Sequence, residues 1–155
     1  MIPVLTREAI EPLMDWIELA DALAEGHRLP PAQIEDTLLS RGEDKLLSRA
    51  AWIDGLGVGV KSVTIFAGNA ARGLPSVQGA MQVFDDTTGQ LEAVIDNGLI
   101  TKWKTAGDSL LGARLLARKD ARKLLIIGAG TVAASLIEAY SALIPDLEVT
   151  VWARR

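Results

Sequence analysis

One stretch of sequence decides the fold: Leu124-Leu125-Ile126-Ile127-Gly128-Ala129-Gly130-Thr131-Val132-Ala133. Four consecutive apolar residues predict a short strand that is covered on both faces, and the glycines lead directly into a helix expected to run to about Leu143. Pro145-Asp146 ends that helix, and Leu147–Trp152 is predicted to be a second strand. A buried strand, a glycine-rich turn, a helix and another strand form a βαβ unit, the setting in which dinucleotides are bound.

The turn has the spacing Gly128-x-Gly130-x-x-Ala133. The first glycine permits a tight turn, the second lets the backbone approach a pyrophosphate, and Ala133 suits a close contact between helix and strand. The free N–H groups of the helix N-terminus favour an anion. The candidate cofactor-binding residues are Gly128, Ala129, Gly130, Thr131, Val132 and Ala133. The alternative is a glycine-rich strand-to-helix turn that binds no nucleotide.

The second strand is followed by Ala153-Arg154-Arg155. NAD-binding units usually carry an acidic residue here to hold the ribose 2′-hydroxyl, and none is present. Two guanidinium groups suit a 2′-phosphate, so Arg154 and Arg155 are further candidate cofactor-binding residues and favour NADP(H), with NAD(H) as the other possibility. Alternatively, both arginines are solvated charges.

Composition excludes several classes of function. The 155 residues are 49% hydrophobic and 23% charged, as in a globular protein, and the net charge of −4 argues against a nucleic-acid partner. No cysteine is present, which excludes disulfides and thiolate sites. Since no apolar run approaches the length of a membrane span, we expect no membrane association and a cytoplasmic location. The one histidine, His27, is expected to be solvated at a helix end, so metal binding is not expected.

Upstream of residue 122 the pattern predicts a mixed domain. The expected helices are Thr6–Gly26, with Pro12 as a candidate break, Ala32–Ser40, and Leu99–Arg118 with an apolar stripe of Leu110, Leu111, Ala113, Leu115 and Leu116. Arg41–Asp44 is a predicted turn. The expected strands are Leu46–Ile53, Val58–Phe66, and the hairpin of Val77–Phe84 with Leu91–Ile95. Asp85-Asp86 before Thr-Thr-Gly is interpreted as turn chemistry rather than a metal site.

A set of motifs in fixed order resembles the ornithine cyclodeaminase/μ-crystallin family. The motifs are Gly59–Asn69, Arg72–Gly79, Phe84–Gly89, Ile100–Ser109 and the Gly128–Ala133 turn. The resemblance implies an NAD(P)-dependent oxidoreductase of amino-acid metabolism that acts on a small amino acid or cyclic imine. Ornithine cyclodeamination to proline and the reduction of Δ1-pyrroline-2-carboxylate or a related ketimine are the leading activities that it implies.

The resemblance also implies roles for individual residues. Lys61 matches the lysine that contacts the substrate carboxylate and reacting nitrogen, which makes it the candidate catalytic residue. Lys104 stands where the family usually has a carboxylate-binding arginine, and Ser76 stands where a Ser or Thr lies near cofactor and substrate. On the residues alone, a strand lysine with a solvated head is the favoured interpretation of Lys61, and the resemblance reverses that preference. Arg49 and Arg72 could also reach a carboxylate, but both are expected to be solvated.

The predicted class is therefore α/β: an N-terminal α+β substrate-binding and dimerisation domain, residues 1–121, followed by the first βαβ unit of a Rossmann domain, residues 122–155. This corresponds to the N-terminal half of a typical family member, so we expect a truncated Rossmann domain. Because the resemblance implies pairing through the substrate-binding domain, we also expect a homodimer. The alternative is a non-catalytic fragment that acts as a cofactor-binding or dimerisation module.

Overall fold

A computed structural model describes residues 1–154, which form two compact units. The first unit comprises Met1–Pro12 and Leu29–Ile100, and the second comprises residues 13–28 and the chain from Thr101 onward. The second unit thus combines a segment near the N-terminus, residues 13–28, with the βαβ segment. The domain boundary expected between residues 121 and 122 stays a prediction.

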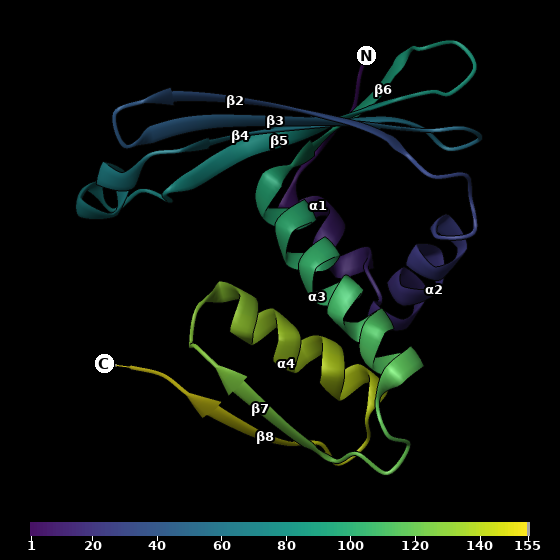
Figure 1. Ribbon diagram of the computed structural model, residues 1–155, viewed down its shortest axis with the longest axis vertical. Coiled ribbons are helices and arrows are strands. Elements are labelled where there is room, and N and C mark those ends of the chain that lie inside the picture. The colour runs from purple at the N-terminus through teal and green to yellow at the C-terminus, as the bar shows by residue number, and fades with distance from the viewer. Residues whose placement is uncertain (155) are drawn as a thin grey trace. The chain divides into compact units, whose positions relative to one another are not determined.

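The first unit is built on a six-stranded sheet in the order β1-β6-β5-β4-β3-β2 (Figure 1). Its strands are β1 (Val4–Leu5), β2 (Gln33–Arg41), β3 (Asp44–Ile53), β4 (Gly57–Ile65), β5 (Val77–Phe84) and β6 (Leu91–Asp96). Strands β2 to β6 form an antiparallel meander, and β1 pairs with β6 in parallel. The predicted strands and the β5–β6 hairpin are confirmed.

One close approach constrains the register of this sheet. Gly79 on β5 pairs with Val63 on β4, and a Cβ at residue 79 would lie 2.0 Å from the Ser62 carbonyl oxygen and 2.8 Å from the Val63 Cα. Both obstacles are backbone atoms, which cannot rotate away. Only glycine therefore allows β4 and β5 to approach this closely at this pair.

The helix predicted over Ala32–Ser40 is wrong, because this segment is the edge strand β2. All nine β2 residues pair with β3, from Gln33 with Trp52 to Arg41 with Asp44. The two strands are joined by Gly42-Glu43, with Gly42 at φ 60°. A glycine with positive φ at the first position of a two-residue loop is typical of a tight hairpin, and the predicted turn at Arg41–Asp44 marks it.

The helix predicted over Thr6–Gly26 is interrupted. Thr6 caps the short helix α1 (Arg7–Ile10), the 3-10 turn η1 (Glu11–Leu13) contains Pro12, and α2 (Trp16–Gly26) begins anew. Proline lacks the N–H that a continuous helix needs, which explains the break. The Asp15 carboxylate then accepts hydrogen bonds from the backbone N–H groups of Ile17 and Glu18, at 2.8 and 3.0 Å, and so restarts the helix.

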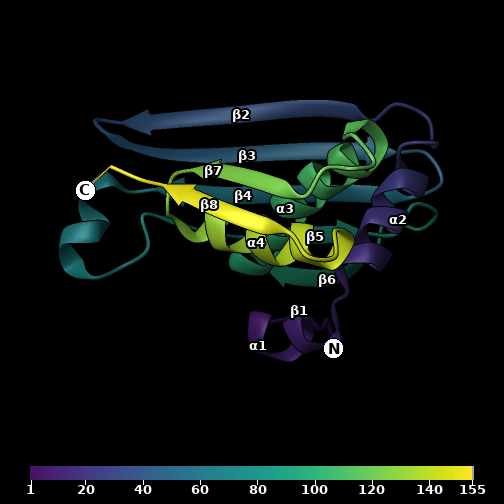
Figure 2. The same ribbon diagram turned by 90° about the horizontal axis from the view of Figure 1, so that it is seen from below.

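The second unit contains α2, most of α3 (Asn97–Leu116) and the βαβ segment of β7 (Lys123–Ile127), α4 (Thr131–Leu143) and β8 (Glu148–Trp152). Strands β7 and β8 are parallel neighbours, as predicted, and α4 runs alongside them (Figures 1 and 2). In the core, the Trp16 ring stacks on Trp103 with centroids 3.9 Å apart. None of the described helices is long and apolar enough to span a membrane.

The apolar stripe expected on α3 is only partly correct. Leu110 and Leu111 are buried, whereas Leu115 and Leu116 are 69% and 87% exposed. The buried face of α3 in the second unit includes Trp103, Ala106 and Leu110, which follow one another at helical spacing. The last turn of the helix extends beyond its packing partners.

We predict that Gly79→Ala lowers the free energy of unfolding by at least about 2 kcal/mol, because the new methyl group would force β4 and β5 apart. Urea unfolding followed by circular dichroism measures the change. Gly68→Ala is the matched control, since a Cβ at residue 68 meets no atom within 4 Å. Equal stability of the two variants would contradict the prediction.

Candidate functional site

The glycine-rich turn has the geometry that its sequence predicts. Gly128 follows β7 with φ 116°, a conformation that side chains rarely adopt, and its N–H donates to the Trp152 carbonyl oxygen at 2.7 Å. This hydrogen bond joins the carboxyl end of β7 to that of β8. In parallel αβ folds, ligands bind at this end of the strands.

The turn leaves open space in front of α4. Gly130 is the N-cap residue of α4, no side chain caps the helix, and a Cβ at residue 130 would meet no atom within 4 Å. Packing within the described chain therefore does not require glycine here. A pocket of about 290 Å³ extends over this turn, and its lining residues include Gly128, Gly130, Thr131, Val132 and Ala133. An uncapped helix N-terminus beside open space fits a dinucleotide pyrophosphate.

The side chain of Arg154 is exposed. Arg154 follows Trp152 by two residues, and the carbonyl oxygen of Trp152 accepts the hydrogen bond from Gly128. Its place in the chain is thus close to the glycine turn, where a ribose would follow the pyrophosphate. Arg155 lies outside the described residues. A role in binding the 2′-phosphate stays a prediction for both arginines.

Lys61 lies on β4, in the middle of the first unit's sheet, and is half-buried. It pairs with Arg49 on β3 and with Met81 on β5. A pocket of about 200 Å³ is lined by Leu47, Arg49, Lys61 and Val63. Arg49 is the residue whose importance the sequence did not indicate, because the register of the β3–β4 hairpin brings it beside Lys61.

Ser76 lies in the same unit but not beside Lys61. It precedes β5, and its carbonyl oxygen accepts from the Phe66 N–H at 2.8 Å, which closes the loop that contains η2 (Ala67–Arg72). Met81, the β5 partner of Lys61, is five residues further along, roughly 17 Å of extended chain. The sheet of the first unit therefore does not bring Ser76 into contact with Lys61, and its role in binding stays a prediction.

Lys104 belongs to the second unit, on the exposed side of α3. Its ammonium forms an ion pair with Asp108, one turn along the helix. The expected pairing of Lys104 with Lys61 spans two units and stays a prediction.

The acidic pair Asp85-Asp86 has the structural role that the sequence indicated. Asp85 accepts hydrogen bonds from the N–H and the hydroxyl of Thr88, at 2.7 and 2.6 Å, which lower the pKa of its carboxyl group. Asp86 accepts from the Trp52 indole at 3.0 Å. Among the described residues, no three acidic or histidine side chains are grouped to hold a metal ion, and His27 is exposed at the end of α2.

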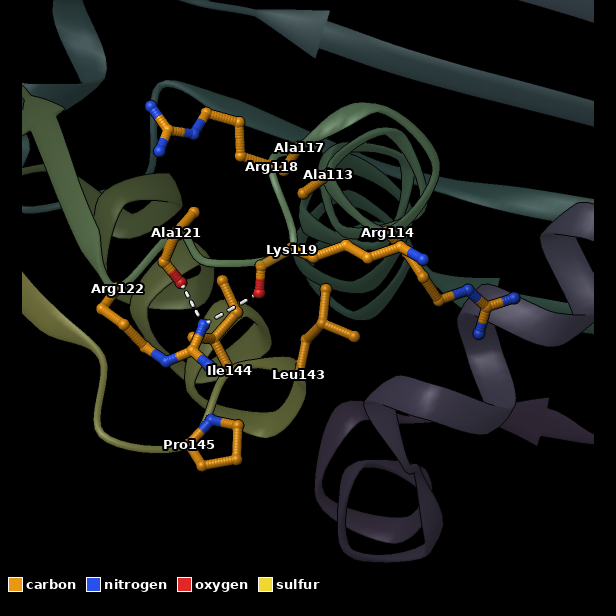
Figure 3. Close-up of a pocket in the computed structure, with 10 residues that line it drawn as sticks. All are labelled: Ala113, Arg114, Ala117, Arg118, Lys119, Ala121, Arg122, Leu143, Ile144 and Pro145. Atoms are coloured by element: carbon orange, nitrogen blue, oxygen red, sulfur yellow. Dashed lines mark hydrogen bonds between the residues drawn. The ribbon is translucent and has the colours of Figure 1, made fainter.

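A basic pocket of about 230 Å³ lies where α3 and α4 end (Figure 3). Each of its arginines has an internal partner. Arg114 pairs with Asp21 at 2.7 Å, Arg118 pairs with Asp120 at 2.5 Å, and Arg122 donates to the carbonyl oxygens of Lys119 and Ala121 at 3.2 and 2.7 Å. Cations at helix C-termini stabilise the helix ends, which accounts for this cluster without a ligand.

Taken together, the parallel βαβ segment and its open glycine turn define the class: an α/β protein with the beginning of a Rossmann-like dinucleotide-binding fold. Residues 48–155 match the model of the ornithine cyclodeaminase/mu-crystallin family. The chain belongs to this family, as the sequence motifs predicted.

Individual relatives agree with this assignment. The chain is 58% identical over 143 residues to a Delta(1)-pyrroline-2-carboxylate reductase of Paracoccus denitrificans, which covers 92% of this chain and 45% of the relative. An archaeal alanine dehydrogenase dimer with bound NAD superposes with a TM-score of 0.86 at 29% identity, covering 98% of this chain and 48% of that one.

The Thermococcus litoralis Delta(1)-pyrroline-2-carboxylate reductase, in complex with NADH and L-proline, superposes with a TM-score of 0.82 at 25% identity. The match covers 99% of this chain and 50% of that one. The chain thus spans about half the length of the relatives it matches, and the predicted fold class is confirmed.

We predict that Gly130→Ala weakens nicotinamide dinucleotide binding roughly tenfold or more, because the methyl group enters the space where a pyrophosphate approaches. The free energy of unfolding should change by less than about 1 kcal/mol, since the protein itself leaves that space open. Tryptophan fluorescence titration with NADPH and NADH, beside urea unfolding, measures both quantities. A variant that binds both dinucleotides like wild type would contradict the prediction.

Proposed function

We propose that this chain provides the substrate-binding part and the pyrophosphate-binding turn of a nicotinamide-dependent reductase that acts on a small cyclic imine carrying a carboxylate. The observation that carries the proposal is the 58% identity to a Delta(1)-pyrroline-2-carboxylate reductase across 92% of the chain. The open turn at Gly130 and the cationic pocket at Lys61 supply the two kinds of site that such an enzyme needs.

The chemistry divides between these two sites. A nicotinamide cofactor bound at the glycine turn would supply the hydride that adds to the carbon of the imine, while a proton adds to the nitrogen. The Lys61 ammonium can bind the substrate carboxylate and hold a proton at Nζ for the nitrogen. Leu47 and Val63 offer apolar contact to a small hydrocarbon ring.

Cyclodeamination of ornithine is the second candidate, because the family model that matches the chain bears that name. It needs the same cofactor turn and a cationic site for the same α-carboxylate. The high identity to a reductase favours imine reduction over cyclodeamination. A non-catalytic role as a cofactor-binding or dimerisation module is the remaining alternative.

Turnover by the full-length protein tests the proposal. We expect oxidation of NADPH or NADH with Δ1-pyrroline-2-carboxylate, which the loss of nicotinamide absorbance measures. We expect no release of ammonia and no formation of L-proline from L-ornithine, a conversion that leaves the cofactor unchanged overall and is therefore assayed by its products. Lys61→Met should lower kcat/KM by about 100-fold or more, because it removes both the charge and the proton at the reacting group. Turnover of L-ornithine alone would favour the second candidate, and turnover of neither would contradict both.

We also propose that the cofactor is NADP(H), on the strength of Arg154 beyond β8 and the lack of an acidic residue there. Arg154→Asp should then shift the ratio of kcat/KM for NADPH over NADH about tenfold or more toward NADH, because a carboxylate repels the 2′-phosphate and accepts from the 2′-hydroxyl. Arg122→Asp, which changes the charge near the other end of the βαβ segment, is the control. An unchanged ratio in Arg154→Asp would contradict NADP(H) recognition by this residue.

A homodimer is proposed as well. The edge strand β2 exposes Ile34 and Leu38 on one face of the sheet and Leu39 on the other, each by more than half, and a second copy that pairs with this edge can cover them. One structural relative is a dimer. Sedimentation velocity of the full-length protein tests this, and a monomer at micromolar concentration would contradict it.

A further inference from the structure

Three charged side chains stand in one row across the first unit's sheet. Asp36 on β2 pairs with Arg49 on β3, and Arg49 pairs with Lys61 on β4. Residues that are directly opposite on neighbouring strands project from the same face, with Cβ atoms about 5 Å apart. The register therefore places Arg49 between an acidic residue on one neighbouring strand and a lysine on the other.

Asp36 holds Arg49 in a defined orientation. The Nε and Nη2 atoms of Arg49 donate to the two carboxylate oxygens of Asp36, at 2.7 and 2.6 Å. This is a bidentate, fork-to-fork pair, which fixes the plane of the guanidinium and occupies two of its five N–H donors, so that the other N–H groups can serve another acceptor. The hydrogen bonds from Arg49 lower the pKa of the Asp36 carboxyl group, so both partners stay charged at neutral pH.

The direct pairing of Arg49 with Lys61 calls for an explanation. Like charges directly opposite each other destabilise a sheet. Arg49 and Lys61 line the same pocket, together with Leu47 and Val63. Two cations beside two aliphatic side chains fit a small molecule that has a carboxylate and an apolar body.

We infer that Arg49 binds the carboxylate of the substrate together with Lys61, and that Asp36 is the positioning residue that orients the Arg49 guanidinium for this contact. The inference rests on the proposed function for the identity of the substrate. It adds a second strand to the substrate site, so that carboxylate recognition is a property of the β3–β4 pair rather than of Lys61 alone.

Another arginine of the same sheet provides an internal comparison. Arg41 also pairs across a hairpin with an aspartate, Asp44, and its Nη2 lies 3.5 Å from the carboxylate. Its guanidinium lies over the Phe66 ring, 5.9 Å from the centroid. Arg41 is thus paired with an aspartate as Arg49 is, but it lies at the end of β2 and outside the row of Lys61, which makes Arg41→Met a matched control.

Equilibrium binding of two probes to the full-length protein tests the inference. Isothermal titration calorimetry with L-proline and with L-prolinamide, each with and without NADH, separates recognition of the carboxylate from recognition of the ring. We expect Arg49→Met to raise the Kd for L-proline about 10- to 100-fold, as for the loss of a charge-assisted hydrogen bond, and to leave L-prolinamide within about 3-fold. Arg41→Met should leave both probes unchanged.

Two further variants test the positioning role, and their effects in the wild-type background do not require Arg49→Met to fold. Arg49→Lys keeps the charge but loses the fork, so its Kd for L-proline should be intermediate. Asp36→Asn should raise this Kd about 3- to 10-fold in the wild-type background and not at all beside Arg49→Met, because its effect passes through Arg49. A purely structural role for the ion pair would change the unfolding midpoint without this coupling.

The outcomes separate this inference from the proposed function. If the wild-type protein does not prefer L-proline over L-prolinamide, or if Arg49→Met binds L-proline as tightly as wild type, the inference is overturned whatever the turnover assay shows. If Arg49→Met loses L-proline binding while no imine is reduced, carboxylate recognition stands and the proposed reaction fails.

Discussion

The register of β4 against its two neighbours, β3 and β5, is the constraint on which the candidate substrate site depends. On the β5 side, Gly79 lets the backbones of β4 and β5 approach where a Cβ would lie 2.0 Å from the Ser62 carbonyl oxygen, and this close contact disfavours other pairings. On the β3 side, Lys61 pairs directly with Arg49. Side chains in a strand alternate between the two faces, so a slip of β4 by one residue against β3 would move Lys61 to the opposite face, and the pocket that it shares with Arg49 exists only in the observed register.

Glycines serve two different purposes in this chain. At Gly79 the neighbouring backbone excludes any side chain, so glycine is required by packing. At Gly130 no protein atom lies within 4 Å of the position that a Cβ would take, so the described chain itself does not need glycine there. A residue that packing leaves unexplained, at an uncapped helix N-terminus, is better explained by a ligand that approaches the backbone. The family assignment, which rests on the match of residues 48–155, agrees with this reasoning.

The βαβ segment was predictable because its signals are local. Strand, turn and helix follow one another within Leu124–Ala133, and the positive φ of Gly128 was implied by its place in the turn. Segments governed by distant partners were less predictable. The sequence of Ala32–Ser40 is compatible with a helix, which is why a helix is predicted there. The segment is a strand because it pairs with β3 along its length. On α3, periodicity could not show that Leu115 and Leu116 extend beyond the packed part of the helix.

The sequence by itself determined the family and the glycine turn, and it singled out Lys61 as a candidate, because each rests on residues that are adjacent or nearly adjacent in the chain. Only the tertiary structure decided which side chains accompany Lys61. Asp36, Arg49 and Lys61 are separated by 13 and 12 residues, and two hairpins of different loop length bring them into one row. Such a row depends on the register of both hairpins at once, and a shift of one residue in either loop would abolish it.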